Sequence, residues 1–412
     1  MSHNNIKKKG SIMSNQFDCH KFLEKLSIPR IPDSEGEAKA QKLIEAELES
    51  LKIESYKKES FIYTKFFMNY LLRVYNFLIG LQMIILIILI YFQLYLIAIC
   101  LSLVLLFTAF FSREIREKIQ FKFTKIGKKR TSYNYIINFP AKEKDPNKTQ
   151  NIIFLAHYDS ISMRFHVIFD GAIFLISLVG GTIFSLHVFI ITLLYISDLI
   201  KTIEILHFMY GIFFAGLYSI QLFNKRHNLS CGTVDDGTGV ANAFYNIDFF
   251  SKNSLSHTNL IFVLTGAEEM GDYGADAFIK RYSSTLNKNN TYFFIVDSVA
   301  ANKSTNLYAH SQGFPKKEFS PIIKRNIEQL IQTSKKTYKI KTMYIPPLIH
   351  FSTDHAPIKP FGYEFMIFLS NGPIHSEKDN ITNYFPEMLD DFNSFSKDLI
   401  IQMEKNLFNR NI

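Results

Sequence analysis

The chain of 412 residues has no tryptophan and only three cysteines, Cys19, Cys100 and Cys231. These cysteines are too few and too scattered for a disulfide framework or for a zinc site made of thiolates. Charge is also missing from long stretches, although the whole chain carries 46 Lys+Arg against 37 Asp+Glu. Polar tracts therefore alternate with apolar blocks, within a length that allows one large domain or two smaller ones.

The first apolar block, Val74–Ser112, contains no charged residue. At about 1.5 Å per residue, one helix of that length would far exceed a hydrocarbon core of roughly 30 Å. We therefore expect two membrane-spanning helices joined by a tight turn near Gln93. A buried helix of a globular core is the weaker interpretation at this length.

The second apolar block covers about 165–223 and has a polar break at 198–204. We expect two spans in it, Gly171–Ser197 and Ile205–Phe223, of which the first is long enough to tilt or to kink at Gly180-Gly181. Three short spans would instead place the two halves of the polar sequence on opposite sides of the membrane. The sequence thus predicts an integral, multi-pass membrane protein with about four helices.

The polar segments are predicted to form one α/β domain that these blocks interrupt. Strands alternate with helices after Lys225, which implies a mostly parallel sheet flanked by helices on both faces. The predicted parts are a flexible N-terminus at 1–16, a domain in three pieces at 17–73, 113–164 and 224–412, and two transmembrane helical hairpins at 74–112 and 165–223.

Basic residues gather after the first apolar block, where Arg113–Arg130 holds eight basic and two acidic residues. No nucleic-acid motif accompanies this segment, so we predict a lipid bilayer beside it and no nucleic-acid partner. Basic residues flank the spans on the side of the α/β domain, and the opposite loops carry almost no net charge. The positive-inside rule then places the α/β domain in the cytoplasm. The flanking residues are Arg73, Arg113, Arg116, Lys118, Lys225 and Arg226.

Two adjacent carboxylates, Glu268 and Glu269, follow a predicted strand at Leu260–Leu264. Alone, they would indicate the solvated start of a helix, because acidic residues favour the first helical turn. At the end of a buried strand, two carboxylates are costly unless a cation or another partner compensates for them. The other acidic and histidine motifs favour this second interpretation.

Five acidic or histidine motifs lie at or just past predicted strand ends. They are His157-Tyr-Asp159, Asp235-Asp236-Gly-Thr-Gly, Glu268-Glu269, Asp297 and His375-Ser-Glu-Lys-Asp379. Ligands of open α/β sheets bind beyond the carboxyl ends of the strands, so we expect these loops to converge. Each motif has an ordinary alternative, such as a turn at the Asp-Asp-Gly sequence. Together, imidazoles and carboxylates suit Zn²⁺ or another first-row ion.

In this order, the motifs resemble the zinc aminopeptidase family M twenty-eight, which is similar to glutamate carboxypeptidases and glutaminyl cyclases. The resemblance also includes Ser27-Ile-Pro-Arg30 and Ser352–Pro357, and it spans about Asp18–Asn406 apart from the two apolar blocks. It implies two zinc ions and peptide substrates with a free N-terminus. The implied ligands are Asp235 as the bridge between the ions, Glu269 and His375 for one ion, and His157 and Asp297 for the other.

By the same resemblance, Glu268 would be the general base, and the Asp159 carboxylate would orient the imidazole of His157. His355 is not the last ligand in this pattern, because the family motif assigns that role to His375. His355 is therefore near the site or structural.

The implied activity is hydrolysis of N-terminal residues from peptides, by a water that the metals activate. Two alternatives stay open. One is a non-catalytic membrane scaffold or receptor of the same fold, and the other is a glutaminyl cyclase-like acyltransferase with a single zinc. No expected ligand is missing, which favours an enzyme. The sequence leaves the oligomeric state and the preferred substrate side chain open.

Overall fold

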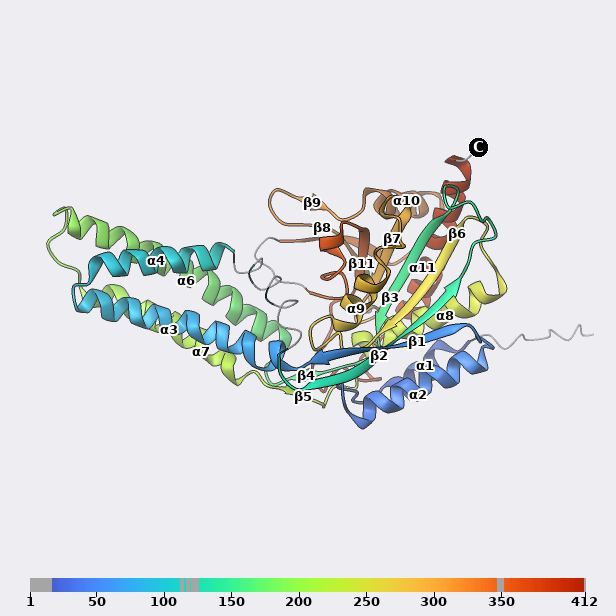
Figure 1. Ribbon diagram of the computed structural model, residues 1–412, viewed down its shortest axis with the longest axis horizontal. Coiled ribbons are helices and arrows are strands. Elements are labelled where there is room, and N and C mark those ends of the chain that lie inside the picture. Colours follow the sequence, from blue (N-terminus) through green and yellow to red (C-terminus); the bar gives the residue numbers. More distant parts are fainter. Residues whose placement is uncertain (1–16, 112–114, 116–118, 120–125, 347–351, 411–412) are drawn as a thin grey trace, which may run out of the picture.

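The computed structural model describes residues 17–111, 115, 119, 126–346 and 352–410. The predicted flexible N-terminus at 1–16 and three of the flanking residues, Arg113, Arg116 and Lys118, lie outside the described residues. The described chain forms an α/β part built on a large sheet and a bundle of four apolar helices, which extends away from the sheet (Figure 1).

A nine-stranded sheet forms the centre of the α/β part. Its strands are β1 (Tyr56–Thr64), β2 (Lys129–Phe139), β3 (Gln150–His157), β6 (Thr258–Thr265), β7 (Thr291–Val296), β8 (Asn306–Gln312), β9 (Lys317–Glu318), β10 (Ile340–Ile345) and β11 (Glu364–Leu369). Their order is β1-β2-β6-β3-β7-β11-β8-β10, and β9 pairs with β8. A separate antiparallel pair is formed by β4 (Ser162–Met163) and β5 (Arg226–His227).

The middle of the sheet is parallel. Strands β6, β3, β7 and β11 are parallel neighbours, and β10 runs parallel to β8. Antiparallel pairs join β1 to β2, β2 to β6, and β11 to β8. The sheet is therefore mixed and mostly parallel, which confirms the predicted α/β class.

Both faces of the central strands are buried. In β3, Ile152 and Phe154 face one hydrophobic core, whereas Ile153 and Leu155 face the other, because successive side chains of a strand point to opposite faces. The first core packs against α1 (Cys19–Leu26), α2 (Glu35–Ser50), α8 (Thr238–Lys252), α10 (Pro321–Thr333) and α11 (Pro386–Arg410). The second core includes residues of α9 (Tyr273–Tyr282). Strands buried on both sides appear in the sequence as nearly continuous apolar runs.

The bundle consists of two helical hairpins. Its helices are α3 (Leu72–Tyr91), α4 (Tyr95–Phe110), α6 (Val167–Ile196) and α7 (Met209–Ile220), with 3-10 turns at Ile205–Phe208 and Gln221–Phe223. The predicted turn near Gln93 is present, and Gln93 itself has φ +60°. Helix α6 runs through Gly180-Gly181 as one helix. A Cβ at Gly180 would lie 2.1 Å from the ring of Phe214, so this glycine allows α7 to approach closely.

The outer surface of the bundle is apolar. Residues such as Met83 and Phe184 fill its interior, but most of the exposed large apolar side chains in the described chain also lie on these helices. The segments Phe67–Tyr91 and Ile168–Ile196 are long and apolar enough to cross a membrane, whereas Tyr95–Ala109 and Met209–Phe223 are shorter. The hairpins are therefore observed as helices, and their place in a membrane stays a prediction.

Candidate metal centre

The carboxyl ends of four neighbouring strands bring the predicted site residues together. Strands β6, β3, β7 and β11 run parallel, so these ends meet at one edge of the sheet. The predicted residues occupy this edge as follows: His157 ends β3, Glu268 and Glu269 follow β6, Asp297 follows β7, His375 follows β11, and Asp235 precedes α8.

One group of potential metal ligands consists of His157, Asp235 and Asp297, whose donor atoms lie within 4.8 Å of one another. Nε2 of His157 is 3.1 Å from Oδ1 of Asp235 and 3.9 Å from Oδ1 of Asp297. This nitrogen is buried and is not in hydrogen-bonding geometry with any described group. Burial lowers the pKa of His157, but nearby carboxylates, that of Glu268 above all, outweigh burial and raise the pKa well above its usual value.

The second group consists of Asp235, Glu269 and His375, again within 4.8 Å. Nε2 of His375 is 3.0 Å from Oδ2 of Asp235 and 3.2 Å from Oε2 of Glu269. Asp235 thus directs one oxygen toward each group. Burial raises the pKa of Asp235, but the imidazoles of His375 and His157 outweigh burial and lower it.

The two groups fit a pair of metal ions. Each offers one imidazole and two carboxylates, with Asp235 shared, and these ligands suit Zn²⁺ and similar ions. A shared carboxylate is the bridge that two ions about 3.5–4 Å apart require. Burial together with the Asp235 carboxylate raises the pKa of Glu269, and a nearby cation would favour its ionised form. The buried, unsatisfied Nε2 of His157 also fits a metal ligand.

Glu268 belongs to neither group but lies beside the first one. Its Oε2 is 3.9 Å from Nε2 of His157. Burial and neighbouring acids, including Asp272 and Asp297, raise the pKa of Glu268 well above its usual value. A carboxylate with a raised pKa suits proton transfer near neutral pH.

The contacts of Asp159 differ from the prediction. Nδ1 of His157 is 3.1 Å from the main-chain oxygen of Asp159 but 3.8 Å from its carboxylate oxygen, so the main-chain carbonyl orients the imidazole. The Asp159 carboxylate instead accepts hydrogen bonds from the main-chain N–H groups of Glu268 and Glu269, both at 3.1 Å. Asp159 therefore positions the two glutamates.

Two further buried carboxylates hold the loops of the site, and the sequence assigned no role to either. Asp236 accepts hydrogen bonds from the main-chain N–H groups of His157 and Ser298, at 3.2 and 3.1 Å. Asp379 accepts from those of Val234 and Asp235, at 2.7 and 3.2 Å. Both lie in motifs that the sequence analysis identified. Their closeness in sequence to a predicted ligand was the feature from which a role in the site could have been predicted.

Arg30 braces the loop before Asp235 and is fully buried. Its guanidinium donates to the main-chain oxygens of Tyr158 at 2.5 Å and Gly232 at 2.6 Å, and also to that of Cys231. Burial lowers the pKa of Arg30, while Asp379 and other acids of the site oppose that change. The sequence identified Arg30 only through its resemblance to a family motif.

His355 lies outside both ligand groups. It is buried, and its ring centroid is 5.4 Å from that of Phe365 and 6.3 Å from that of Phe319. His355 thus packs among aromatic side chains, in agreement with a structural role.

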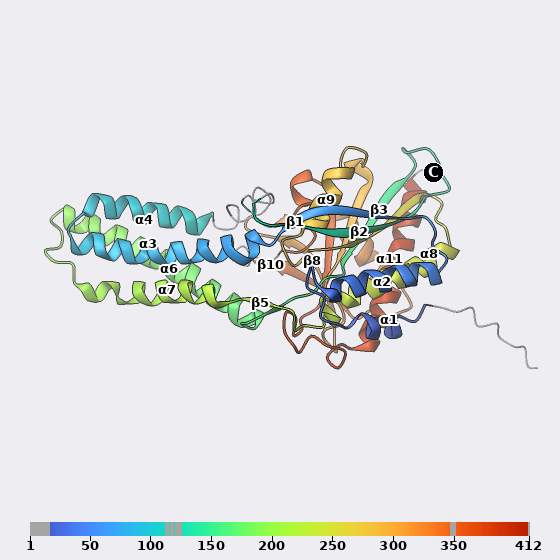
Figure 2. The same cartoon turned by 60° about the horizontal axis from the view of Figure 1, so that its bottom comes forward.

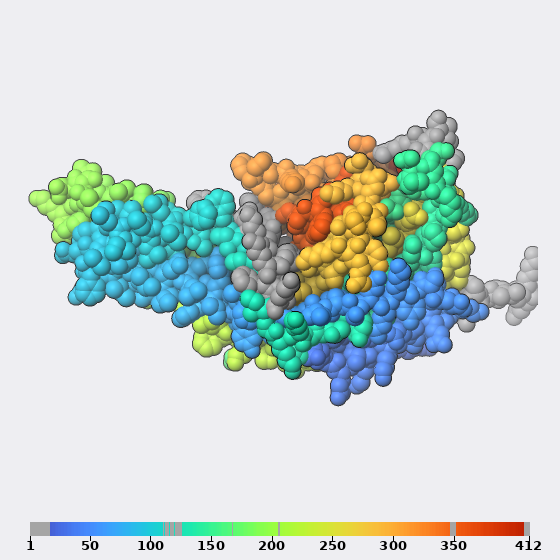
Figure 3. All heavy atoms as spheres, viewed as in Figure 1, coloured from blue at the N-terminus to red at the C-terminus, as the bar shows by residue number. Residues whose placement is uncertain are grey.

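The metal centre opens onto a cleft of about 640 Å³, a volume typical of sites for small ligands. Loops of the sheet form one wall, with Glu268 and Asp297 among the lining residues. The root of the bundle forms the other wall and contributes Arg73 and Phe174, and Arg226 of β5 lies in the same wall. Arg73 and Arg226, which the sequence assigned to the membrane flank, therefore line the cleft. Their position weakens the prediction that the α/β part lies in the cytoplasm. The bundle and the α/β part appear as adjoining lobes in Figure 3.

This fold and its histidine and carboxylate groups define an α/β protein with a candidate metal centre at the carboxyl ends of its strands. Residues 217–409 match the family model described as Peptidase family M28. The matched segment contains five of the seven predicted site residues, namely Asp235, Glu268, Glu269, Asp297 and His375.

Solved structures with a similar fold include glutaminyl cyclases, and weaker structural matches include aminopeptidases. The Acidobacteriales bacterium glutaminyl cyclase has a TM-score of 0.53 at 11% identity, with 98% of this chain and 99% of that chain covered. The Bacteroides thetaiotaomicron glutaminyl cyclase has a TM-score of 0.51 at 12% identity, with 93% and 98% covered. The aminopeptidase from Aneurinibacillus sp. strain AM-1 has a TM-score of 0.40 at 17% identity, with 67% of this chain and 49% of that chain covered. The present chain thus spans about half the length of that aminopeptidase. At such low identities, the likeness to the two glutaminyl cyclases shows a shared fold alone, and no curated protein matches in sequence.

Proposed function

We propose that this chain is a metal-dependent enzyme that acts at the N-terminal residue of peptides, and that it is an aminopeptidase with two zinc ions. The observation that carries the proposal is the position of Asp235 between two complete ligand groups. His157 and Asp297 would hold one ion, and Glu269 and His375 the other. When bound, the ions supply a water of lowered pKa and stabilise negative charge on a carbonyl oxygen.

The proton transfers fall to Glu268. Its carboxylate lies beside the first ligand group and lines the cleft, so it can take a proton from the attacking water and return it to the leaving amine. Asp159 fixes the main chain at Glu268 and thereby its distance from His157. Acidic residues such as Asp272 also line the cleft and favour a substrate with a free ammonium group.

A glutaminyl cyclase-like acyltransferase is the second candidate. The likeness to solved structures favours it, because two glutaminyl cyclases cover this chain almost from end to end. This activity would use one ion, and Glu268 would move protons within an N-terminal glutamine. The presence of His157 and Asp297 beside the shared Asp235 favours the hydrolase with two ions.

The two candidates are separated by their products. Zinc-loaded protein is incubated with a panel of aminoacyl anilides and with a peptide that begins with glutamine, and the products are followed by mass spectrometry. An aminopeptidase releases free amino acids, whereas a cyclase releases ammonia and leaves every peptide bond of the chain intact. Cyclisation alone would establish the second candidate. No reaction with either substrate would contradict both and favour a non-catalytic scaffold.

The proposal extends to the location of the chain. The apolar outer surface of the bundle supports a place in a lipid bilayer, as do the two helices that are long enough to cross one. With both hairpins returning to the same side, the α/β part lies on one face of the membrane. Although Arg73 and Arg226 line the cleft, the remaining basic residues that flank the apolar blocks in the sequence favour the cytoplasmic face. These residues are Arg113, Arg116, Lys118 and Lys225.

A further inference from the structure

Three polar side chains lie where the apolar helices of the bundle reach the cleft. Arg73 and Asn76 belong to α3, and Gln221 begins the 3-10 turn after α7. All three line the cleft of the metal centre. Asn76 is 7% exposed and Gln221 is 5% exposed, so both amides are buried. Buried polar groups are costly in apolar surroundings, and polar residues within membrane helices mark functional sites.

The side-chain amides of Asn76 and Gln221 form one hydrogen bond with each other, which uses one polar atom of each amide. Nδ2 of Asn76 donates to Oε1 of Gln221. Oδ1 of Asn76 and Nε2 of Gln221 have no hydrogen-bond partner within the described part of the chain. One amide oxygen and one amide NH₂ group therefore remain unused, and flipping both amides again leaves one oxygen and one NH₂ group. A peptide group, with one N–H and one C=O, complements this pair.

Arg73 adds a positive charge to the same wall. Its Nε is buried without a hydrogen-bond partner, and Arg73 forms no ion pair with another described residue. Arg226 and Asp170 line this wall too, but each has a partner in the chain, such as the main-chain oxygen of Met68 for Arg226. A guanidinium binds a carboxylate through two parallel hydrogen bonds, which makes Arg73 suited to a substrate carboxylate.

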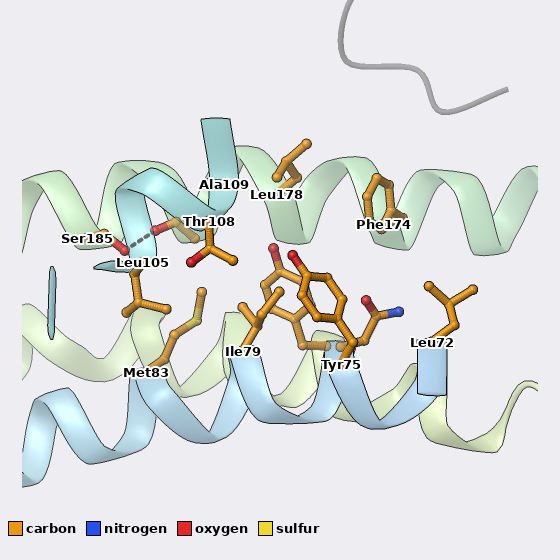
Figure 4. A pocket seen from close by; sticks show the side chains of 13 residues that line it. Leu72, Tyr75, Ile79, Met83, Leu105, Thr108, Ala109, Phe174, Leu178 and Ser185 are labelled. Carbon is orange, nitrogen blue, oxygen red and sulfur yellow. Dashed lines mark hydrogen bonds between the residues drawn. The ribbon is translucent and has the colours of Figure 1, made fainter. Parts of the chain in front are cut away.

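The cleft ends at this wall. A second cavity lies farther inside the bundle, but its volume is about 20 Å³, enough for about one water molecule. Leu72 and Phe174 line both spaces and lie at the same end of the inner cavity (Figure 4). A substrate that extends from the metal centre toward the bundle would therefore end near Arg73, because the cavity beyond it is too small for a further residue.

We propose that the substrates are short peptides with a free C-terminal carboxylate, and that the root of the bundle binds this end. Asn76 and Gln221 bind a main-chain amide beyond the scissile bond, and Arg73 binds the terminal carboxylate. This inference rests on the proposed action at the N-terminal residue. It makes the bundle part of the substrate site and restricts the enzyme to short peptides.

The test compares leucyl-alanine with leucyl-alanine amide, which differ only in the terminal charge. The wild type is expected to prefer the acid by tenfold or more in kcat/KM, because hydrogen bonds between charged groups are the strong ones. Arg73→Ala should reduce kcat/KM for the acid at least tenfold more than for the amide, and Arg73→Lys should restore part of the preference. Arg164→Ala is the control, because this exposed arginine lies near the cleft but does not line it.

Equal losses for both peptides in Arg73→Ala would overturn the inference and assign Arg73 to a structural or lipid-headgroup contact. A wild type without preference for the acid would overturn it as well. If the wild type cleaves neither peptide, the proposed function is wrong. The inference about Arg73 is then tested by measuring the binding of the two peptides. Calorimetry on zinc-loaded Glu268→Gln, with and without Arg73→Ala, should then show tighter binding of the acid only when Arg73 is present.

Discussion

The α/β part and the bundle differ in how their apolar side chains are buried. In the α/β part, neighbouring strand residues such as Ile152 and Ile153 are both fully buried, because helices or loops cover each face of the sheet. In the bundle, Met83 and Phe184 are buried, but residues such as Leu96, which is 75% exposed, point outward. Figure 2 shows the bundle extending clear of the sheet. Exposed apolar surfaces of this extent mark interaction sites, and we propose that a bilayer covers this one.

Both regions contain buried polar groups. The carboxylates of Asp159, Asp236 and Asp379 accept main-chain hydrogen bonds within the α/β part, but burial still raises the pKa of each. At the root of the bundle, Oδ1 of Asn76 and Nε2 of Gln221 are buried without a hydrogen-bond partner among the described residues, and both side chains line the cleft. We propose that the buried acids of the α/β part serve metal ions, whereas the polar groups at the root of the bundle serve a substrate.

The largest effect on activity is expected from substitution of Glu268, because the comparison of the two regions assigns the catalytic chemistry to the α/β part. Glu268→Gln preserves shape but removes the base, so kcat should fall about 10²–10⁴-fold while the zinc content stays unchanged. The measurement combines a rate assay with metal analysis. Glu377→Gln, an exposed change in the loop of His375, should leave the rate near that of the wild type. Unchanged turnover in Glu268→Gln would remove Glu268 from the mechanism.

A smaller effect, on stability, is expected at Arg30. Arg30→Ala removes a buried guanidinium that binds three main-chain oxygens around the site and leaves nearby acids uncompensated. Breaking such a buried network costs about 3–5 kcal/mol of unfolding free energy, which denaturant titration can measure. Arg325→Ala on exposed α10 should change it by about 0.5 kcal/mol or less. A loss as small as that control would show that Arg30 does not brace the site.

A pH-dependent effect of about 2 kcal/mol is expected at Glu37 in α2. Its carboxylate accepts hydrogen bonds from Ser132 at 2.6 Å and from the main-chain N–H of Asp33 at 2.5 Å. Burial raises the pKa of Glu37 from 4.5 to about 6, so the folded state holds the proton more tightly than the unfolded state. The resulting stabilisation is complete below pH 4.5 and is lost as the pH rises through 6.

Glu37→Gln keeps an acceptor and removes the charge, so it should exceed the wild type in stability by up to about 2 kcal/mol at pH 7. The difference should vanish at pH 4, and Glu35→Gln, which is exposed, should show no such trend. Urea unfolding at the two pH values provides the measurement. An equal effect at both pH values would contradict the role of ionisation.

The smallest effect is expected from single tryptophan substitutions. Because the chain has no tryptophan, each introduced tryptophan is the only one that reports by fluorescence. Phe213→Trp places one reporter on the outer surface of the bundle, where Phe213 is 59% exposed, and Phe314→Trp places one on the α/β part, where Phe314 is 90% exposed. In vesicles that contain brominated lipids, only the first reporter should show blue-shifted and quenched emission. Equal spectra for both variants would contradict the membrane location of the bundle.

The convergence of four of the five predicted ligands could be expected from the sequence because each lies at or past a strand end, whereas Asp235 precedes α8. Apolar strands such as β6 are easy to recognise, and parallel topology then brings their following residues together. Elements with a weaker apolar pattern were missed, among them β10, whose middle residues are largely exposed. The short helix α1 and strand β8 also went unrecognised.

Roles that depend on distant contacts could not be predicted. Arg30 binds the carbonyl of Gly232, about 200 residues away, and no local pattern encodes that contact. The role of Asp159 depended on which of its oxygens faces His157. Arg73 resembled a membrane flank because its place in the cleft arises only when the bundle meets the sheet.

The central claim is that Asp235 joins two metal sites, and metal stoichiometry tests it most directly. The purified chain is saturated with zinc, freed of excess ions, and measured by mass spectrometry for metal per chain. We expect two zinc ions in the wild type, one in Asp297→Ala, and a loss of both in Asp235→Ala. A wild type that holds one zinc ion or none would contradict the shared-ligand centre.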